Sequence, residues 1–116
     1  MAKRKSAKPH PTLAMPQLTA VAQLFTVLSE VSRLRILQVL QSGPASVGEL
    51  MEQTGMKQAN VSKQLGILLT AGVIDRRPEG NRAIYSIAMP IVTDLCQLVC
   101  EGVARQAARR AAALQR

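Results

Sequence analysis

Apolar residues recur at helical spacing along the first third of the chain and predict two consecutive helices. From Gln17 onward one stripe of a helix is apolar, and it consists of Leu18, Val21, Leu24, Phe25 and Leu28. Ser29 is a candidate cap for the second helix, because serine side chains accept hydrogen bonds from the free amides of a first turn. The predicted inward face of that helix is Val31, Leu34, Leu37 and Leu40, broadened by Ile36 and Val39. Gly43 and Pro44 predict where it ends.

The next segment predicts a short helix, a tight turn and a longer helix. Ser46 and Glu49 have the spacing of a capping box, in which each side chain bonds the backbone amide of the other residue, and Gly55 predicts the end of this helix. The longer helix spans about residues 57–71 and ends at Gly72. Its predicted inward residues are Val61, Leu65, Leu68 and Leu69. Its opposite face is small and polar, with Ala59, Asn60, Ser62, Lys63 and Gly66, and with Gln58 and Gln64 at the flanks.

A hairpin and a final helix complete the predicted elements. Two β-type runs, residues 73–77 and 82–87, flank a Gly80-Asn81 turn, a pattern typical of a hairpin. Pro90 suits the first turn of the last helix. The apolar arc of that helix covers roughly 160° of its circumference, and it consists of Ile91, Val92, Leu95, Cys96, Leu98, Val99, Gly102 and Val103. Such an arc is wider than one small domain usually covers.

This order of elements predicts a mainly α fold with a small β-hairpin and a helix-turn-helix at its centre. The second helix of such a pair can enter the major groove of DNA, which is wide enough to admit it. The hairpin then brings Arg76, Arg77 and Arg82 beside that helix, near phosphates or the minor groove. The alternative is a helical bundle whose hairpin has no binding role. The positive charge of the segment that also carries the polar face favours DNA.

Charge is distributed unevenly along the 116 residues, which carry a formal net charge of +8. Residues 1–16 and residues 102–116 each hold four basic and no acidic side chains, whereas residues 17–101 hold seven of each. We predict a flexible basic arm (residues 1–16), a folded DNA-binding and dimerisation domain (residues 17–103) and a basic, Ala-rich helical tail (residues 104–116). A neutral body with basic stretches suits an anionic polymer, although basic tails also serve solubility alone.

Composition argues against several functional classes. No apolar run approaches the roughly 18 to 20 residues that span a bilayer, and the basic start lacks the apolar segment of a secretory signal, so we expect no membrane partner. Aromatic residues make up 2% of the chain, too few for the stacking platforms of single-strand binders. His10 is the only histidine, and no base, nucleophile or phosphate-cradling loop can be assembled. We therefore expect neither an enzyme nor a required cofactor.

Four segments resemble the ArsR family of bacterial winged-helix repressors. Residues 28–37 (LSEVSRLRIL) are similar to the family's LADPTRLRIL stretch. Residues 49–65 (ELMEQTGMKQANVSKQL) resemble its helix-turn-helix, which is usually close to DLAxxxGLSQPTVSRHL. Residues 71–74 (AGVI) and 79–85 (EGNRAIY) are similar to its AGLV segment and its wing pattern EGRxxxY. The resemblance covers about residues 20–103.

The resemblance implies a winged helix-turn-helix that forms a homodimer through its first and last helices. It also implies a repressor bound to double-stranded DNA and released by a small effector, often a metal or metalloid ion. On the recognition helix it implicates Lys57, Gln58, Ala59, Asn60, Ser62, Lys63 and Gln64. On the wing it implicates Arg76, Arg77, Asn81 and Arg82. Asn and Gln side chains can pair bidentately with adenine, and Lys with guanine acceptors. The main alternative is a nonspecific architectural DNA-binding protein that uses its basic arms.

The effector sites of well-known family members are incomplete in this chain. Ser46 and Gly48 stand where arsenic-sensing members carry Cys-x-Cys. Asp94 begins a segment that echoes the zinc-sensing pattern, but Ala107 and Arg110 stand where its second half would fall. Neither of these two metal sites is therefore intact.

Cys96 and Cys100 are the remaining candidates for sensing, four positions apart on the last helix. Their Cβ atoms should lie about 5–6 Å apart, too far for an unstrained disulfide but compatible with one shared metal ion. Three interpretations stay open: core or interface residues, a redox sensor, or a soft metal or metalloid site completed by the dimer mate or by His10. Two thiols without an easy disulfide fit a reducing cytoplasm.

Overall fold

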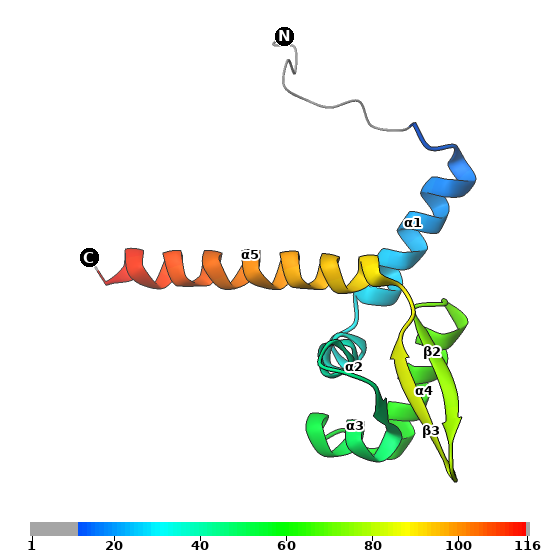
Figure 1. Ribbon diagram of the computed structural model, residues 1–116. Helices are drawn as coiled ribbons and strands as arrows, with labels where there is room; N and C mark the ends of the chain where they lie inside the picture. The colour runs from blue at the N-terminus through cyan, green and yellow to red at the C-terminus, as the bar shows by residue number, and fades with distance from the viewer. Residues whose placement is uncertain (1–11, 116) are drawn as a thin grey trace.

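The computed structural model describes residues 12–115, in which five helices and a three-stranded sheet form a folded body with one long projecting helix (Figure 1). The elements are α1 (Met15–Leu28), α2 (Val31–Gln41), β1 (Ala45–Ser46), α3 (Val47–Thr54), α4 (Gln58–Thr70), β2 (Ile74–Glu79), β3 (Arg82–Ile87) and α5 (Pro90–Leu114). Most of the predicted arm, residues 1–11 with His10, lies outside the described residues, and so does residue 116.

The core lies between α2, α3, α4, the sheet and the beginning of α5. Its fully buried side chains are Ile36, Leu37, Leu50, Val61, Leu65, Leu68, Val73, Ile74 and Val92. The predicted inward face of α4 is confirmed, because Val61, Leu65 and Leu68 are buried and Leu69 packs against the core. This packing fixes one side of α4 and leaves the other side of the helix to solvent.

The predicted inward face of α2 is partly wrong. Leu37 and Leu40 are buried, but Val31 is 70% exposed and Leu34 is 40% exposed. Ile36, which the sequence pattern placed at the edge of the stripe, is fully buried. The helix is thus rotated so that Ile36 and Leu37 point into the core together, and its first turn presents apolar side chains to the surface of the single chain.

Local hydrogen bonds define the helix ends. The predicted capping box is confirmed, since the Ser46 amide donates to Glu49 Oε1 at 3.0 Å and the Glu49 amide donates to Ser46 Oγ at 3.2 Å. The predicted cap at Ser29 is wrong. The Glu30 carboxylate accepts from the Arg33 amide at 3.2 Å and caps α2, whereas the Ser29 hydroxyl donates to the Thr26 carbonyl at 2.7 Å and closes α1.

The sheet contains one strand that the sequence pattern did not predict. The predicted hairpin is confirmed as β2 and β3, but β1 adds a third strand, in the order β1-β3-β2. Ala45 pairs with Tyr85 and Ser46 pairs with Ile84 in an antiparallel register. A two-residue strand is too short for an alternating pattern, so it left no signal in the sequence. Because Ser46 also caps α3, β1 joins the helix-turn-helix directly to the hairpin.

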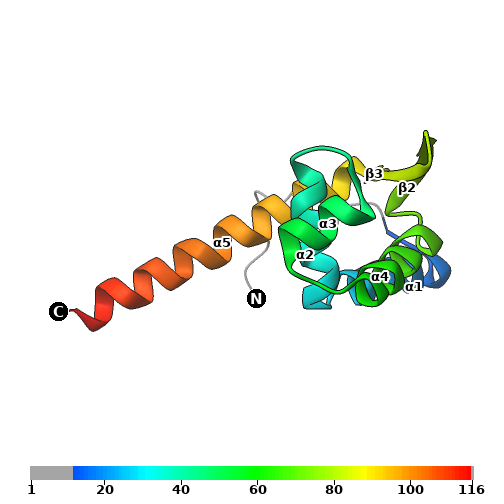
Figure 2. The ribbon, with the colours of Figure 1, turned by 90° about the horizontal axis from the view of Figure 1, so that it is seen from below.

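Like the first turn of α2, helices α1 and α5 expose apolar side chains on the single chain. On α1 these are Leu18, Val21 and Phe25, and on α5 they are Ile91, Leu98, Val99 and Val103. Figures 1 and 2 both show α5 running out from the body, with its C-terminal half beyond the other elements. The wide apolar arc predicted for the last helix is therefore present, and the body covers only the part that includes Val92 and Cys96.

Candidate nucleic-acid interface

The turn between α3 and α4 is held by three contacts. Gly55 ends α3 with a φ of 72°, a left-handed conformation that favours glycine. The Thr54 hydroxyl donates to the Leu50 carbonyl at 2.6 Å and accepts from the Met56 amide at 3.2 Å. The Arg35 guanidinium donates to the Thr54 carbonyl. These bonds set the angle at which α4 leaves the turn, so the exposed face of α4 has a fixed direction.

The exposed face of α4 has the predicted small and polar character. Gln58, Ala59, Ser62 and Lys63 are exposed, and the N-cap Lys57 is exposed as well. Lys57 makes no side-chain capping bond, and no acidic residue occupies the first turn of the helix. Free amides at a helix N-terminus attract anions, so this end of α4 suits a phosphate group.

Two predicted recognition residues lie deeper than expected. Gln64 is 6% exposed, and its side chain bonds two neighbours. The Arg33 Nη1 donates to Gln64 Oε1 at 2.9 Å, and Gln64 Nε2 donates to Asn60 Oδ1 at 3.0 Å. Asn60 is half-buried at the edge of the exposed face. The expectation that Gln64 faces bases directly is therefore corrected, because its amide is turned inward toward α2.

Arg33 is the residue of this region that sequence reasoning missed. It lies on α2, and its Nε donates to the Val27 carbonyl at the end of α1 at 2.5 Å. Arg33 lies within residues 28–37 (LSEVSRLRIL), which resemble the family stretch, but its charge alone suggested nothing about its partners. Its bond to Gln64 joins residues 31 positions apart, so no local pattern in the sequence could have revealed it.

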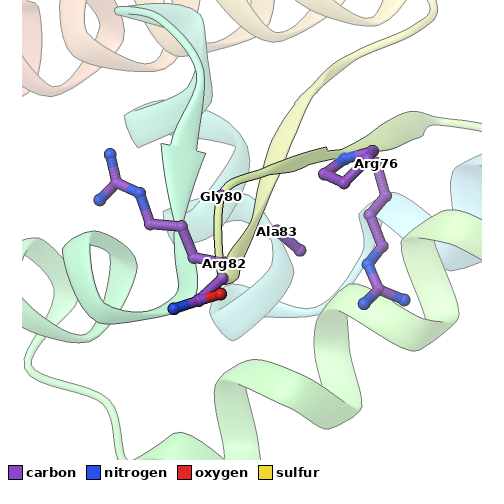
Figure 3. A pocket seen from close by; sticks show the side chains of 6 residues that line it. Arg76, Gly80, Arg82 and Ala83 are labelled. Atoms are coloured by element: carbon purple, nitrogen blue, oxygen red, sulfur yellow. The ribbon is translucent and has the colours of Figure 1, made fainter.

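The hairpin arginines lie on opposite faces of the sheet. The register pairs Arg77 with Ile84 and Glu79 with Arg82, which places Arg77 and Arg82 on one face and Arg76 on the other. Figure 3 shows the Arg76 side chain extending toward α4 and the Arg82 side chain leaving on the other side. Both residues border a hollow of about 480 Å³ around the hairpin tip, whose other lining residues are Pro78, Gly80, Asn81 and Ala83.

Ion pairs distinguish these arginines further. Arg82 lies 3.6 Å from Glu49 and 3.6 Å from Glu79, and Arg77 lies 3.8 Å from Glu79. Within residues 12–115, Arg76 has no acidic partner within 4.0 Å. Hydrogen bonds from Ser46 hold the pKa of Glu49 below its usual value, with a smaller contribution from Arg82. Glu49 is therefore ionised at neutral pH, and its negative charge lies beside Arg82 and not beside Arg76.

The Arg76→Ala variant is expected to weaken DNA binding more than Arg82→Ala does. Removing a free cation that contacts a phosphate makes the negative slope of log K against log salt shallower by about 0.9. Arg82 must give up its ion pairs with Glu49 and Glu79 to contact a phosphate, so its net contribution to binding is smaller. Titrations of both variants at several salt concentrations measure the difference. Equal slopes in Arg76→Ala and the parent protein would show that Arg76 contacts no phosphate.

The two cysteines occupy different environments on α5. Cys96 is 8% exposed, and burial, followed by the neighbouring Cys100, raises its thiol pKa. Cys100 is exposed, and both thiols are free. Residues 12–115 contain no group of three or more His, Cys, Asp or Glu side chains that could hold a metal ion. A raised pKa disfavours the thiolate that metals require, and residues 12–115 of one chain do not bring a complete set of metal ligands together.

Comparisons with known proteins agree with this geometry. A family model described as "Bacterial regulatory protein, arsR family" matches residues 30–76. The uncharacterized HTH-type transcriptional regulator Rv0081 of Mycobacterium tuberculosis is 40% identical over 95 residues, which cover 81% of this chain and 83% of the relative. Its crystal structure superposes with a TM-score of 0.73 at 38% identity, over 84% of this chain and 98% of that chain.

Two further relatives extend the comparison. The biofilm growth-associated repressor of Xylella fastidiosa strain 9a5c is 33% identical over 103 residues, which cover 84% of this chain and 90% of the relative. The solution structure of a homodimeric winged helix-turn-helix DNA-binding domain, Mb0332 from Mycobacterium bovis, superposes with a TM-score of 0.71. It is 33% identical and covers 82% of this chain and 87% of that chain.

These findings settle the class of the protein. The predicted fold, mainly α with a β-hairpin wing, is confirmed, with α3 and α4 as the helix-turn-helix and β2–β3 as the wing. None of the helices in residues 12–115 combines the length and the apolar character needed to cross a membrane. The chain belongs to the ArsR family of bacterial regulatory proteins, whose members are transcriptional regulators and not enzymes.

Proposed function

We propose that this protein is a homodimeric, sequence-specific repressor that inserts α4 into the major groove of double-stranded DNA in the bacterial cytoplasm. The observation that carries the proposal is the division of α4 into two faces. Val61, Leu65 and Leu68 anchor one face in the core, while the other presents hydrogen-bonding side chains to solvent. A wing with a free cation stands beside that face. The name of the Xylella fastidiosa relative, a repressor, supports the direction of regulation.

The exposed side chains of α4 divide into two roles. Gln58, Ser62 and Lys63 lie along the exposed face and read base edges, with Lys63 suited to the acceptor atoms of guanine. Lys57 and the free amides of the first turn bind a phosphate, as the exposed N-terminus of α4 favours. Ala59 lets the helix approach the groove closely. Arg76, Arg77, Asn81 and Arg82 contact the flanking backbone from the wing.

Dimerisation covers the apolar side chains that the single chain exposes on α1 and α5. A soluble protein rarely leaves large apolar patches unpartnered, and the Mycobacterium bovis relative is a homodimer. A two-fold dimer presents two α4 helices to half-sites separated by one helical turn of DNA, or by a multiple of it. The basic side chains of the arm (residues 1–16) and of the tail (residues 104–116) add phosphate contacts that raise affinity without reading sequence.

The effector part of the proposal rests on the position of the cysteines. Cys96 and Cys100 lie on the same helix as the exposed Val99 and Val103. A soft metal or metalloid ion, or an oxidant, that engages these thiols therefore acts where two subunits meet. Because residues 12–115 of one chain contain no group of three metal ligands, a bound ion draws in addition on the second subunit or on an arm residue such as His10. Release from DNA then follows from a change in how the subunits are arranged.

A matched pair of lysine variants tests the recognition helix. Lys63→Ala is expected to lower affinity for the operator by about 1–3 kcal/mol and to relax selectivity at one base pair, while Lys57→Ala weakens binding to all sequences alike. The measurement is a titration of each variant with the DNA upstream of the protein's own gene and with scrambled DNA. If the parent protein bound both DNAs equally, with affinity lost on trimming residues 1–11 and 104–116, it would be an architectural DNA-binding protein.

The effector is tested with the double variant Cys96→Ser/Cys100→Ser. We expect As(III), Zn(II) or a mild persulfide donor to release the parent protein from DNA and to leave the double variant bound. Reduced protein without additive is the reference in both cases. Equal release of both proteins would place the sensing site elsewhere in the chain, and the repressor function would stand unchanged.

A further inference from the structure

A chain of three hydrogen bonds leads from the end of α1 to the exposed face of α4. Arg33 on α2 donates through Nε to the Val27 carbonyl at 2.5 Å and through Nη1 to Gln64 Oε1 at 2.9 Å. Gln64 then donates through Nε2 to Asn60 Oδ1 at 3.0 Å. Gln64 is buried, Arg33 is half-buried, and Asn60 lies at the border of the exposed face. The three side chains are therefore linked to one another, and only Asn60 lies at the border of the exposed face of α4.

The chemistry of Arg33 fixes the direction of the whole chain. A guanidinium group only donates hydrogen bonds, so Gln64 must turn its carbonyl oxygen toward Arg33. The amide nitrogen of Gln64 then points at Asn60, and because that nitrogen only donates, it must meet the carbonyl oxygen of Asn60. Asn60 is left with its NH₂ group for any outside partner, and its carbonyl already accepts a bond from within the protein.

We propose that Asn60 reads the operator through its amide NH₂ group, and that Arg33 and Gln64 are positioning residues that set this orientation. This inference rests on the proposed function. In the major groove guanine offers the acceptors N7 and O6, adenine offers N7 and thymine offers O4, whereas cytosine offers only its N4 amine, a donor. Asn60 therefore selects against cytosine at the position it faces. Residue type alone predicts a bidentate pairing with adenine, which uses both the carbonyl and the NH₂ group of Asn60. We propose instead that Asn60 recognises acceptor atoms through its NH₂ group alone.

The variant Gln64→Glu reverses the direction of the chain. A glutamate accepts from Arg33 as glutamine does, but it has no proton to donate to Asn60. Asn60 must then turn its NH₂ group inward, and its carbonyl faces the DNA. The preferred base edge changes from an acceptor to a donor, so cytosine is expected to change from the weakest base to a favoured one. The measurement is competition binding with operators that carry each of the four base pairs at every half-site position.

The expected change is about tenfold in relative affinity at one position, with selectivity at the remaining positions unchanged. Gln38→Glu is the matched control, because it adds the same charge at an exposed position on α2 and should leave every preference as in the parent protein. If the parent shows no preference at any position, the proposed function fails. If the parent has preferences and Gln64→Glu retains all of them, only the present inference fails.

A measurement on the free protein separates the orientation from DNA binding. In amide proton exchange followed by NMR, the side-chain NH₂ of Gln64 is expected to exchange slowly, because it is buried and bonded, and that of Asn60 to exchange rapidly. Asn60→Asp, which keeps the size of the side chain and removes its donors, is expected to lose the preference against cytosine. Slow exchange at Asn60 with rapid exchange at Gln64 would overturn the proposed direction.

Discussion

The Val99→Asp variant is expected to be a monomer and to bind a two-half-site operator about 100-fold more weakly than the parent protein. Val99 is 54% exposed and lies in the middle of the apolar arc of α5. A carboxylate there would have to be buried against apolar side chains of the second subunit without a partner, which is strongly unfavourable. Once the subunits separate, each half-site is bound alone, and the gain from linked binding, about 10²–10⁴ in affinity, is lost.

Light scattering coupled to gel filtration measures the first effect, and titration with the operator measures the second. Gln97→Asp is the control, because Gln97 is an exposed polar residue on the other side of α5 and the substitution introduces the same charge. It should remain dimeric with unchanged affinity. A dimeric Val99→Asp protein with the affinity of the parent would exclude α5 from the subunit interface.

The Leu65→Ala variant is expected to lower the free energy of unfolding by about 2–5 kcal/mol. Leu65 is fully buried on the inner face of α4, so the substitution leaves a cavity directly behind the recognition surface. The loss is large relative to the total stability of a small domain, which is about 5–15 kcal/mol. Urea unfolding at one fixed protein concentration measures the change, since the stability of a dimer depends on concentration.

Leu114→Ala provides the matched control for this substitution. It removes the same atoms at the exposed end of α5, and an exposed change of this kind is expected to alter stability by no more than about 0.5 kcal/mol. Equal stabilities for Leu65→Ala and the parent would mean that α4 does not pack on the core as described. A change in the slope of unfolding free energy against urea concentration for Leu65→Ala would indicate either altered compactness of the unfolded or folded state or unfolding that is no longer two-state.

Short-range signals predicted most of the fold. Gly55 and Gly72 mark the ends of α3 and α4, the Ser46 and Glu49 pair marks the start of α3, and Gly80 with Asn81 marks the hairpin. Each of these signals acts within a few residues, so the sequence alone reveals it. The beginning of α1 differs from prediction by two residues, because Pro16 is accommodated in the first turn of the helix.

The errors arise where contacts between distant residues decide the outcome. Val31 and Leu34 fit a helical stripe, but the packing of α3 and α4 against α2 leaves both exposed and buries Ile36 beside the correctly predicted Leu37. Gln64 lies at the flank of the polar face, and only its bond to Arg33, 31 positions away, turns it inward. Helical periodicity contains no information about such partners. The division of roles along α4 therefore required the tertiary structure.

The short strand β1 has a consequence for how DNA is selected. Because β1 pairs with β3 while Ser46 also caps α3, the helix-turn-helix and the wing form one stiff unit within a subunit. We expect this link to hold the distance between α4 and the wing tip constant. A DNA duplex whose grooves do not match that distance must then itself deform. Deformation energy depends on the stiffness of the intervening base steps. Operators will therefore be ranked partly by flexible base pairs that no side chain touches.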